Sequence, residues 1–420
     1  MGRHLGDKGP IPRSDLMLTN FRCISTACLI LLLPTVVLAQ IPKKTPRFLL
    51  TSDDGNSELE IQLTVQARWD GTRIDEGETS TGTFELYLRR IRPVLAAKLL
   101  GGDLSLLLHL NIVPGAMELM DIYGDYAFSS KVRLRVGQMK IPFTRWRLNS
   151  FKDRPTLDWS YPSKYFGAER QLGVMLHNGV SASPEWEYQI GVFDGVNSRA
   201  SHGVGMPLIY GLDRPNASSL DDPSPLENLH AEVVAHVAYN ARGIDVRYPT
   251  DFAGGGLRWS TGMSVAWDIE PTPGQDMRLR IAPEVALAVG GFGGTAVGYL
   301  GFYDPTQRAG SHVFGLWGGL VQLSYLFEQR YELAVKYSTV RVLSGLREDA
   351  QSRARARLGA GEDIGAIGQT AAENELNLNL NVYVLGSTLK LQVEGALLLH
   401  ERDSDNRYDM AVRTQMQLAF

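Results

Sequence analysis

The 420-residue sequence predicts an all-β fold, a transmembrane antiparallel β-barrel. Three observations predict it. Apolar and polar residues alternate with a period of two along most of the chain. No stretch beyond residue 40 approaches the length of apolar sequence that a membrane-spanning helix needs. Short and long connections between these segments alternate along the chain, which is typical of a bacterial outer-membrane barrel with short periplasmic turns and long external loops.

Residues 1–39 are predicted to be a secretory signal peptide. Arg22 precedes the apolar run ACLILLLPTVVL, residues 27–38, and Ala39 ends a cleavage site of small residues. A membrane anchor is the alternative interpretation, but this run is shorter than the roughly 20 apolar residues that span a bilayer. Translation could start at Met1 or at Met17.

Both cysteines, Cys23 and Cys28, lie within this leader. The mature chain is therefore expected to contain no cysteine, so it uses neither disulfides nor thiol chemistry. The formal net charge of −4 and the lack of a recognisable module give no support to nucleic-acid binding.

Alternation is clearest in ELEIQLTVQARW, residues 58–69, and it recurs in ELNLNLNVYV, residues 375–384. About 16 segments of this kind are expected to be strands. They are 58–69, 83–98, 102–112, 118–128, 131–140, 168–177, 186–194, 229–239, 256–268, 276–290, 293–303, 311–327, 330–343, 373–385, 387–399 and 407–420. Residues 40–57 are expected to form a periplasmic lead segment and residues 58–420 one barrel, whose first and last strands pair because an open edge in lipid is costly.

The connections between these segments fall into two groups. Those at 101–102, 129–130, 328–329 and 386–387 are tight, whereas 141–167, 195–228 and 344–372 are the longest. Two connections fit the pattern poorly, since 240–255 is long for a turn and 113–117 is short for a loop.

The two faces of the predicted strands differ in chemistry. The polar face carries too much charge and amide for a dry core, so we expect it to line a wet lumen while the apolar face meets lipid. Aromatic residues near strand ends are expected to form the interfacial girdles; they are Trp69, Phe84, Tyr239, Trp267, Tyr331, Tyr408 and Phe420.

The connection 141–167 is rich in positive charge and long enough to fold back into the lumen. Cations in a low-dielectric wall attract anions, so we interpret five cations in this connection, together with one just before it, as an anion-attracting pore constriction. They are Lys140, Arg145, Arg147, Lys152, Arg154 and Lys164. The alternative is a solvated external loop whose cations pair with inward acids such as Glu284 or Glu394.

Further cations are expected on the inner wall, because pointing them outward would cost about 2 to 4 kcal/mol each in lipid. These are Lys131, Arg133, Arg135, Arg278 and Arg280. Another basic run, Arg353, Arg355 and Arg357, could hold lipopolysaccharide phosphates, overhang the mouth, or be a surface loop without a role in passage.

No catalytic constellation is evident in the sequence. The histidines at 109, 177, 230, 236 and 400 lie in expected strands without a distinctive serine and acid partner. His230 and His236 would lie roughly 20 Å apart along a strand, too far to share a metal. We therefore expect no enzyme activity, no cofactor and no metal.

The string GQMKIPF, residues 137–143, enters the charged loop, and GAERQLGVML, residues 167–176, follows it. This arrangement resembles the phosphate-selective porin O/P family, with Arg145-Trp146-Arg147 standing where acidic residues would be expected. The resemblance implies a passive, anion-preferring outer-membrane porin that forms homotrimers. Its partners would be small inorganic or organic anions, outer-membrane lipids and lipopolysaccharide. An outer-membrane hydrolase and a structural or adhesive barrel are the alternatives.

Overall fold

The computed structural model describes residues 48–75, 79–113, 116–167, 170–180, 182–195, 231–269, 277–305, 310–358, 370–402 and 406–420, without the side chains of 353–358. The expected signal peptide, residues 40–47 of the expected lead segment, most of the loop 195–228 and the side chains of Arg353, Arg355 and Arg357 lie outside this range.

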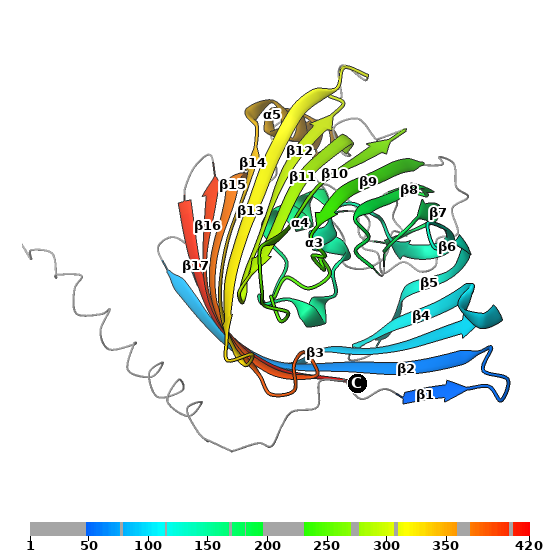
Figure 1. The fold of residues 1–420 in the computed structure, drawn as a ribbon. Helices are drawn as coiled ribbons and strands as arrows, with labels where there is room; N and C mark the ends of the chain where they lie inside the picture. The colour runs from blue at the N-terminus through cyan, green and yellow to red at the C-terminus, as the bar shows by residue number, and fades with distance from the viewer. Residues whose placement is uncertain are drawn as a thin grey trace, which may run out of the picture. The chain divides into compact units, whose positions relative to one another are not determined.

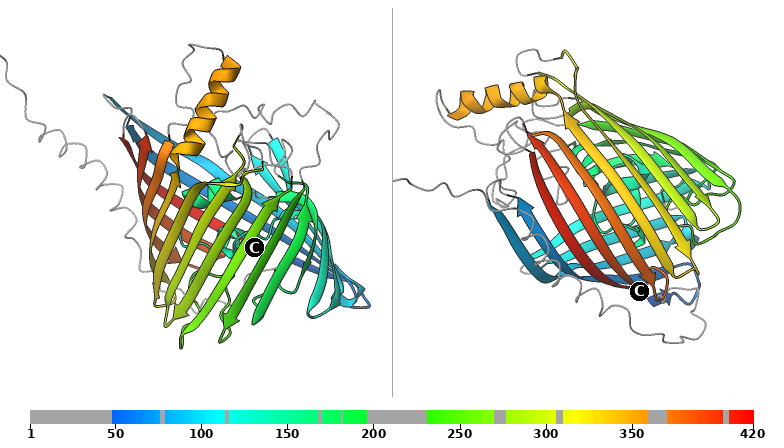
Figure 2. Two further views of the ribbon diagram at one scale, coloured as in Figure 1. Left: turned by 90° about the horizontal axis from the view of Figure 1, so that it is seen from above. Right: turned by 90° about the vertical axis from the view of Figure 1, so that its left-hand side faces the viewer.

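The described residues form a closed antiparallel barrel (Figures 1 and 2). Each strand pairs with the next along the chain, and β17 pairs with β2, which closes the wall and confirms the expected pairing of the first and last strands. All sixteen predicted segments are strands, with ends displaced by a few residues. They are β2 (Glu58–Asp75), β3 (Ser80–Leu99), β4 (Leu104–Val113), β5 (Ala116–Ser129), β6 (Val132–Lys140), β7 (Arg170–His177), β8 (Trp186–Phe193), β9 (Glu232–Ala241), β10 (Arg258–Asp268), β11 (Met277–Val289), β12 (Phe292–Tyr303), β13 (Val313–Phe327), β14 (Tyr331–Val342), β15 (Thr370–Tyr383), β16 (Leu389–Arg402) and β17 (Asn406–Ala419).

One additional strand, β1 (Phe48–Thr51), comes from the expected lead segment. It pairs with residues 58–61 at the start of β2. On the same edge of β2, β17 pairs with residues 64–73, and Phe420 exchanges two backbone hydrogen bonds with Leu63. β1 therefore continues the closing seam where the C-terminal strand ends.

Tight turns connect the strands at one end of the barrel, as predicted. Glu328 and Gln329 both have positive φ angles, 54° and 55°, which is the backbone twist of a two-residue hairpin turn. At the other end lie longer segments, including α5 (Ser344–Leu358), which projects beyond the strand ends (Figure 2). No helix within the described ranges is long and apolar enough to cross a membrane.

Alternation along the strands separates the two faces of the wall. On β15, Leu376, Leu378 and Leu380 are exposed on the outside, whereas the intervening asparagines 377, 379 and 381 are completely buried. These inward amides are covered by a segment inside the barrel rather than bathed by an open lumen.

The covering segment follows β6 and spans residues 141–167; it carries α3 (Arg145–Leu148), η3 (Phe151–Asp153) and α4 (Tyr161–Phe166). Figure 1 shows α3 and α4 inside the ring of strands. A hydrophobic core lies between this segment and the inner wall, and it includes Phe143, Trp146, Phe166, Tyr299 and Leu316. Phe166 stacks on Tyr299 with ring centroids 5.2 Å apart.

The long connection after β9, which fitted the predicted pattern poorly, also folds inward. Thr250 and Asp251 are buried, and the Thr250 hydroxyl lies 3.2 Å from the Tyr383 hydroxyl on β15. Phe252 meets the Tyr383 ring edge-on at 5.0 Å. This segment is long because it fills part of the barrel interior instead of making a turn.

Candidate functional site

Residues 141–167, hereafter the inner loop, are held inside the barrel by hydrogen bonds from many strands. Lys390 on β16 donates to the Arg154 carbonyl at 2.9 Å, and Lys336 on β14 donates to the Asp158 carbonyl at 3.1 Å. Arg280 on β11 donates to the Phe166 carbonyl at 2.6 Å. Backbone carbonyls that would otherwise be buried without a partner are satisfied in this way, which fixes the path of the loop.

The local structure requires the glycine at position 137, at the start of the string that leads into the inner loop. Gly137 has a φ angle of 133°, and a Cβ atom there would collide with the Ile122 carbonyl oxygen on β5. Only glycine allows β6 to approach β5 this closely. Thr144 then caps α3, and its side chain accepts a hydrogen bond from the Arg147 amide.

The cations predicted to line a constriction are mostly structural members of the inner loop. Arg145, Arg147 and Arg154 are only 6%, 5% and 1% exposed. Arg147 and Arg154 both lie against the Trp159 ring, at 4.2 and 3.8 Å from its centroid. Burial lowers the pKa of Arg154 to about 10, which leaves it protonated at neutral pH.

The three remaining cations of this set differ in their surroundings. Lys140 donates to the carbonyls of Arg147, Leu148 and Asn149, at 2.9, 3.3 and 3.3 Å. Lys152 and Lys164 are half-buried, and the Lys164 ammonium lies 5.3 Å from the Tyr161 ring. The structure thus brings five of the six together in the inner loop, with Lys140 at the adjoining end of β6, but uses Lys140 and the three arginines to hold that loop in place.

The five cations predicted on the wall are largely paired with acids. Arg133 and Arg135 both contact Asp125 at 2.7 Å. Arg278 contacts Asp304 at 2.7 Å, Arg280 pairs with Glu232, and Lys131 is exposed in the turn before β6. Four of the five thus stand beside a carboxylate, with Arg133 and Arg135 sharing Asp125.

A different group of arginines, not singled out from the sequence, lines the lumen along β2, β3 and β17. We call it the basic wall; it consists of Arg68, Arg89, Arg90, Arg92 and Arg413. A β-bulge creates it, because Gln66 pairs with Arg90 whereas Ala67 pairs with Leu88. The extra residue, Arg89, turns to the same side as Arg90.

Contacts confirm that these side chains point inward. Arg90 donates to the Gln66 side chain at 2.8 Å, and Arg92 donates to the Asn111 side chain at 3.1 Å. Their guanidinium carbons lie 5.0 and 4.5 Å from the centroid of the Phe151 ring in the inner loop. Within the part of the chain that the structure describes, neither Arg90 nor Arg92 has a salt bridge to a carboxylate.

One acid, Asp158 of the inner loop, faces the other members of the basic wall. It lies 2.8 Å from Arg68, and 3.9 Å from both Arg89 and Arg413. Burial alone would raise the pKa of Asp158, but these three guanidinium groups together hold it well below its ordinary value. Asp158 therefore stays ionised, and Arg413 has a second acid partner in Glu394 at 3.0 Å, so two carboxylates face these three guanidinium groups.

The sequence does contain a signal for this site. On β3 the outward apolar positions run through Phe84, Leu86 and Leu88 and then change phase to Ile91 and Leu95. A phase change within an alternating segment indicates a bulge. Recognising it would have placed two consecutive arginines in the lumen.

A serine, a histidine and acids also meet, although no such constellation was evident in the sequence. His236 lies 2.9 Å from the Ser264 hydroxyl and 3.9 Å from Glu187. The histidine is fully buried, and the adjoining cavity of about 20 Å³ holds no more than a single water molecule. Backbone amides of the inner loop cover the group, since Thr144 donates to Ser264 and Arg145 to Glu284. The cluster anchors the loop.

Within the described ranges, no group of three or more histidine, cysteine, aspartate or glutamate side chains is arranged to hold a metal ion.

The fold and the lumen can be compared with known proteins. Residues 61–208 match the family model of phosphate-selective porin O and P. The fold is similar to the outer membrane channel DcaP of Acinetobacter baumannii, with a TM-score of 0.54 and 12% identity over 88% of this chain and 99% of that chain. It is also similar to the anion-selective porin from Comamonas acidovorans, with a TM-score of 0.54 and 12% identity over 87% and 100% of the two chains.

A third similar structure is OmpF of Salmonella typhi in complex with daunomycin, with a TM-score of 0.52 and 11% identity over 89% and 100% of the two chains. No curated protein sequence matches this chain.

A closed barrel, a loop folded into its interior and an arginine-lined inner wall define the fold as a porin-type β-barrel. Within that class, the match over residues 61–208 confirms the resemblance to the phosphate-selective porin O and P family for this part of the chain, which contains the string Gly137–Phe143.

Proposed function

We propose that the protein is a porin of the Gram-negative outer membrane through which small anions diffuse passively, and that the basic wall attracts them. The observation that carries this proposal is the pair Arg90 and Arg92, which have an aromatic ring and amides for partners instead of carboxylates. A ring face stabilises a guanidinium without cancelling its charge. The positive potential therefore extends into the lumen.

The exposure of side chains also supports a path for solutes on the side of the lumen that carries the basic wall. The Arg89 side chain is 37% exposed, and Arg92, Arg133 and Arg413 are partly exposed. By contrast, inward residues of β14 to β16 are covered by the inner loop. Solutes then pass on the side of the lumen formed by β2 to β6, beside the partly exposed members of the basic wall.

The loop cations take a second role in this proposal. Arg145, Arg147 and Arg154 keep the loop folded and set the width of the path, while the basic wall sets its charge preference. The proposed permeants are small inorganic or organic anions, and the family resemblance supports a homotrimer as the assembly.

Reversal potential in a salt gradient across a planar bilayer tests the proposal. Purified protein should give open, ohmic channels whose reversal potential indicates anion preference, with chloride, phosphate and acetate compared in turn. A closed barrel with lipid or peptide turnover would favour the hydrolase alternative. An open channel that prefers cations would refute the role of the basic wall.

A further inference from the structure

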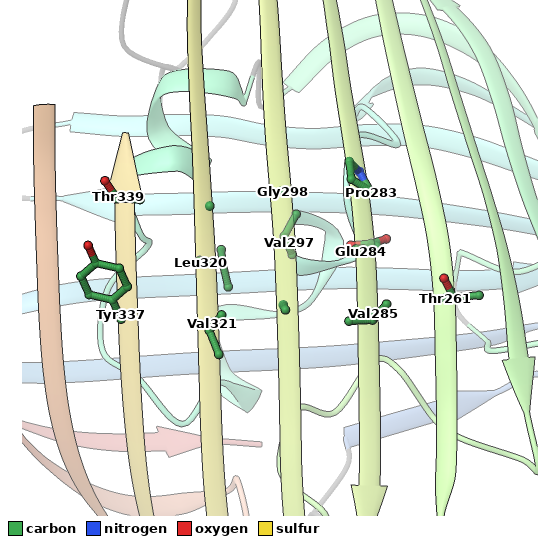
Figure 3. A pocket seen from close by; sticks show the side chains of 12 residues that line it. Thr261, Pro283, Glu284, Val285, Val297, Gly298, Leu320, Val321, Tyr337 and Thr339 are labelled. Carbon is green, nitrogen blue, oxygen red and sulfur yellow. The ribbon is translucent and has the colours of Figure 1, made fainter. Parts of the chain in front are cut away.

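The outer surface of the barrel carries a groove across β10 to β14 (Figure 3). The residues that face outward on β12 and β13 at this place are small, namely Ala296, Gly298 and Gly319. Larger outward residues, Val285 and Tyr337, border them. The hollow has a volume of about 440 Å³.

A hollow in the lipid-facing wall must be filled by apolar matter. An unfilled gap would forfeit the dispersion contacts of every atom that lines it. Val285, Val321 and Tyr337 are all exposed on this face, so the groove opens sideways into the space that lipid occupies. Its width and apolar lining suit one or more acyl chains.

The groove has a polar end. Tyr337 and Thr339, which line it, both donate to the Asn374 side-chain oxygen, at 3.2 and 2.9 Å. Asn374 in turn donates to Glu401 at 2.9 Å, and Arg341 donates to Glu401 at 3.4 Å. All five side chains thus form one polar chain that begins in the groove.

This polar chain lies toward the end of the barrel that carries the long loops. Arg341 is one residue from the end of β14, and Glu401 is one residue from the end of β16. Figure 3 shows Tyr337 and Thr339 on β14, to one side of Gly298 on β12. The Arg341 side chain is 46% exposed and is held by Glu401 only at long distance, which leaves guanidinium donors for another group.

We propose that this groove binds one lipid A moiety of lipopolysaccharide, with an acyl chain between β11 and β14 and the phosphorylated sugar headgroup against Asn374 and Arg341. The groove is apolar within the wall and offers hydrogen-bonding groups toward the end with the long loops. This arrangement matches the acyl chains and headgroup of a lipid in the external leaflet. The amide, hydroxyl and guanidinium groups suit a headgroup that carries amides, hydroxyls and phosphate. A second copy of the barrel would fill the hollow without needing this polar end.

The inference rests on the proposed outer-membrane location but is independent of anion passage. Channel recordings of the same preparations keep the two apart, because a groove variant that loses lipid should conduct as the wild type does.

Filling the groove tests the proposal. A Cβ at Gly298 would meet Pro283 at 3.4 Å, and one at Gly319 would meet the Val297 carbonyl at 3.6 Å, which are ordinary contacts that a folded barrel tolerates. The double variant Gly298→Leu/Gly319→Leu occupies the hollow. Gly395→Leu is the matched control, since Gly395 faces outward on β16 and a Cβ there would meet no atom within 4 Å.

The readout is native mass spectrometry of detergent-solubilised protein titrated separately with purified lipid A and with phosphatidylglycerol. Wild type and Gly395→Leu should each bind one lipid A, and the filled-groove variant should bind it at least about tenfold more weakly, through lost apolar contact. Arg341→Gln should weaken lipid A several-fold. Unchanged lipid A binding in the filled variant, equal binding of phosphatidylglycerol by the wild type, or dissociation of an oligomer on filling the groove would each overturn the proposal.

Discussion

Arginines on different strands of the lumen wall have different kinds of partner. Along β5, β6 and β11, arginines stand beside acids, as Arg133 and Arg135 do at Asp125. Along β3, Arg90 and Arg92 stand against the Phe151 ring. A carboxylate removes charge from the field, whereas a ring holds the side chain and leaves its charge in place. The number of cations near a lumen therefore says less about its selectivity than the identity of their partners does.

The largest expected effect comes from breaking an acid-paired anchor of the inner loop. Arg145 contacts Glu187 at 3.1 Å, and its amide donates to Glu284. Arg145→Ala would leave buried carboxylates without a counterion, which should cost about 3–5 kcal/mol of unfolding free energy. Urea unfolding in detergent micelles checks this, with Lys131→Ala as the exposed control. A loss equal to that of the control would show that the loop is not anchored there.

An intermediate effect is expected at the external end of the barrel, where the stability contributed by an acid–arginine pair should depend on pH. Asp304 contacts Arg278 and His312. Burial opposes ionisation of Asp304, but these partners and the Gly310 amide lower its pKa to about 2. A pKa that is lower in the folded state contributes stability above the unfolded pKa of about 3.9, and this contribution is lost as pH falls toward 2.

Asp304→Asn should therefore lower stability by about 1–2 kcal/mol at pH 7, nearly as much at pH 5, and much less at pH 2.5. Thermal unfolding of wild type and variant at these pH values measures the difference. A difference independent of pH would mean that the ionised carboxylate contributes nothing.

The smallest effect is expected for the ring partner itself. Phe151→Leu removes two cation–π contacts but no charge, so stability should fall by about 1 kcal/mol and anion preference should persist. The lipid-facing Phe128→Leu serves as the control substitution. A reversal potential that moves to cation preference in Phe151→Leu would show that the ring does more than hold the arginines.

Much of this molecule can be predicted from the sequence, because lipid imposes a strict alternation on the wall. That constraint predicted every strand from β2 to β17 and the closing pair. No such constraint acts inside the barrel. There Arg145 and Arg154 are buried by packing against residues far along the chain, such as Val180 and Lys390, which periodicity does not reveal.

The basic wall was missed for a different reason. Its three arginines on β3 face the same side because of one bulge at Arg89, where a change of phase by a single residue decides whether a side chain faces lipid or water. The serine and histidine cluster was missed because Ser264 and His236 lie on neighbouring strands, β10 and β9, whose register places them side by side.

A direct test of the central claim compares two double variants in one salt gradient. Arg90→Gln/Arg92→Gln removes two charges of the basic wall, and Arg147→Gln/Arg154→Gln removes the same formal charge from arginines that also lie against a ring, Trp159, but inside the inner loop. The reversal potential of the first should shift strongly toward cations, and that of the second should stay near the wild-type value. A strong shift in the second with none in the first would contradict the account.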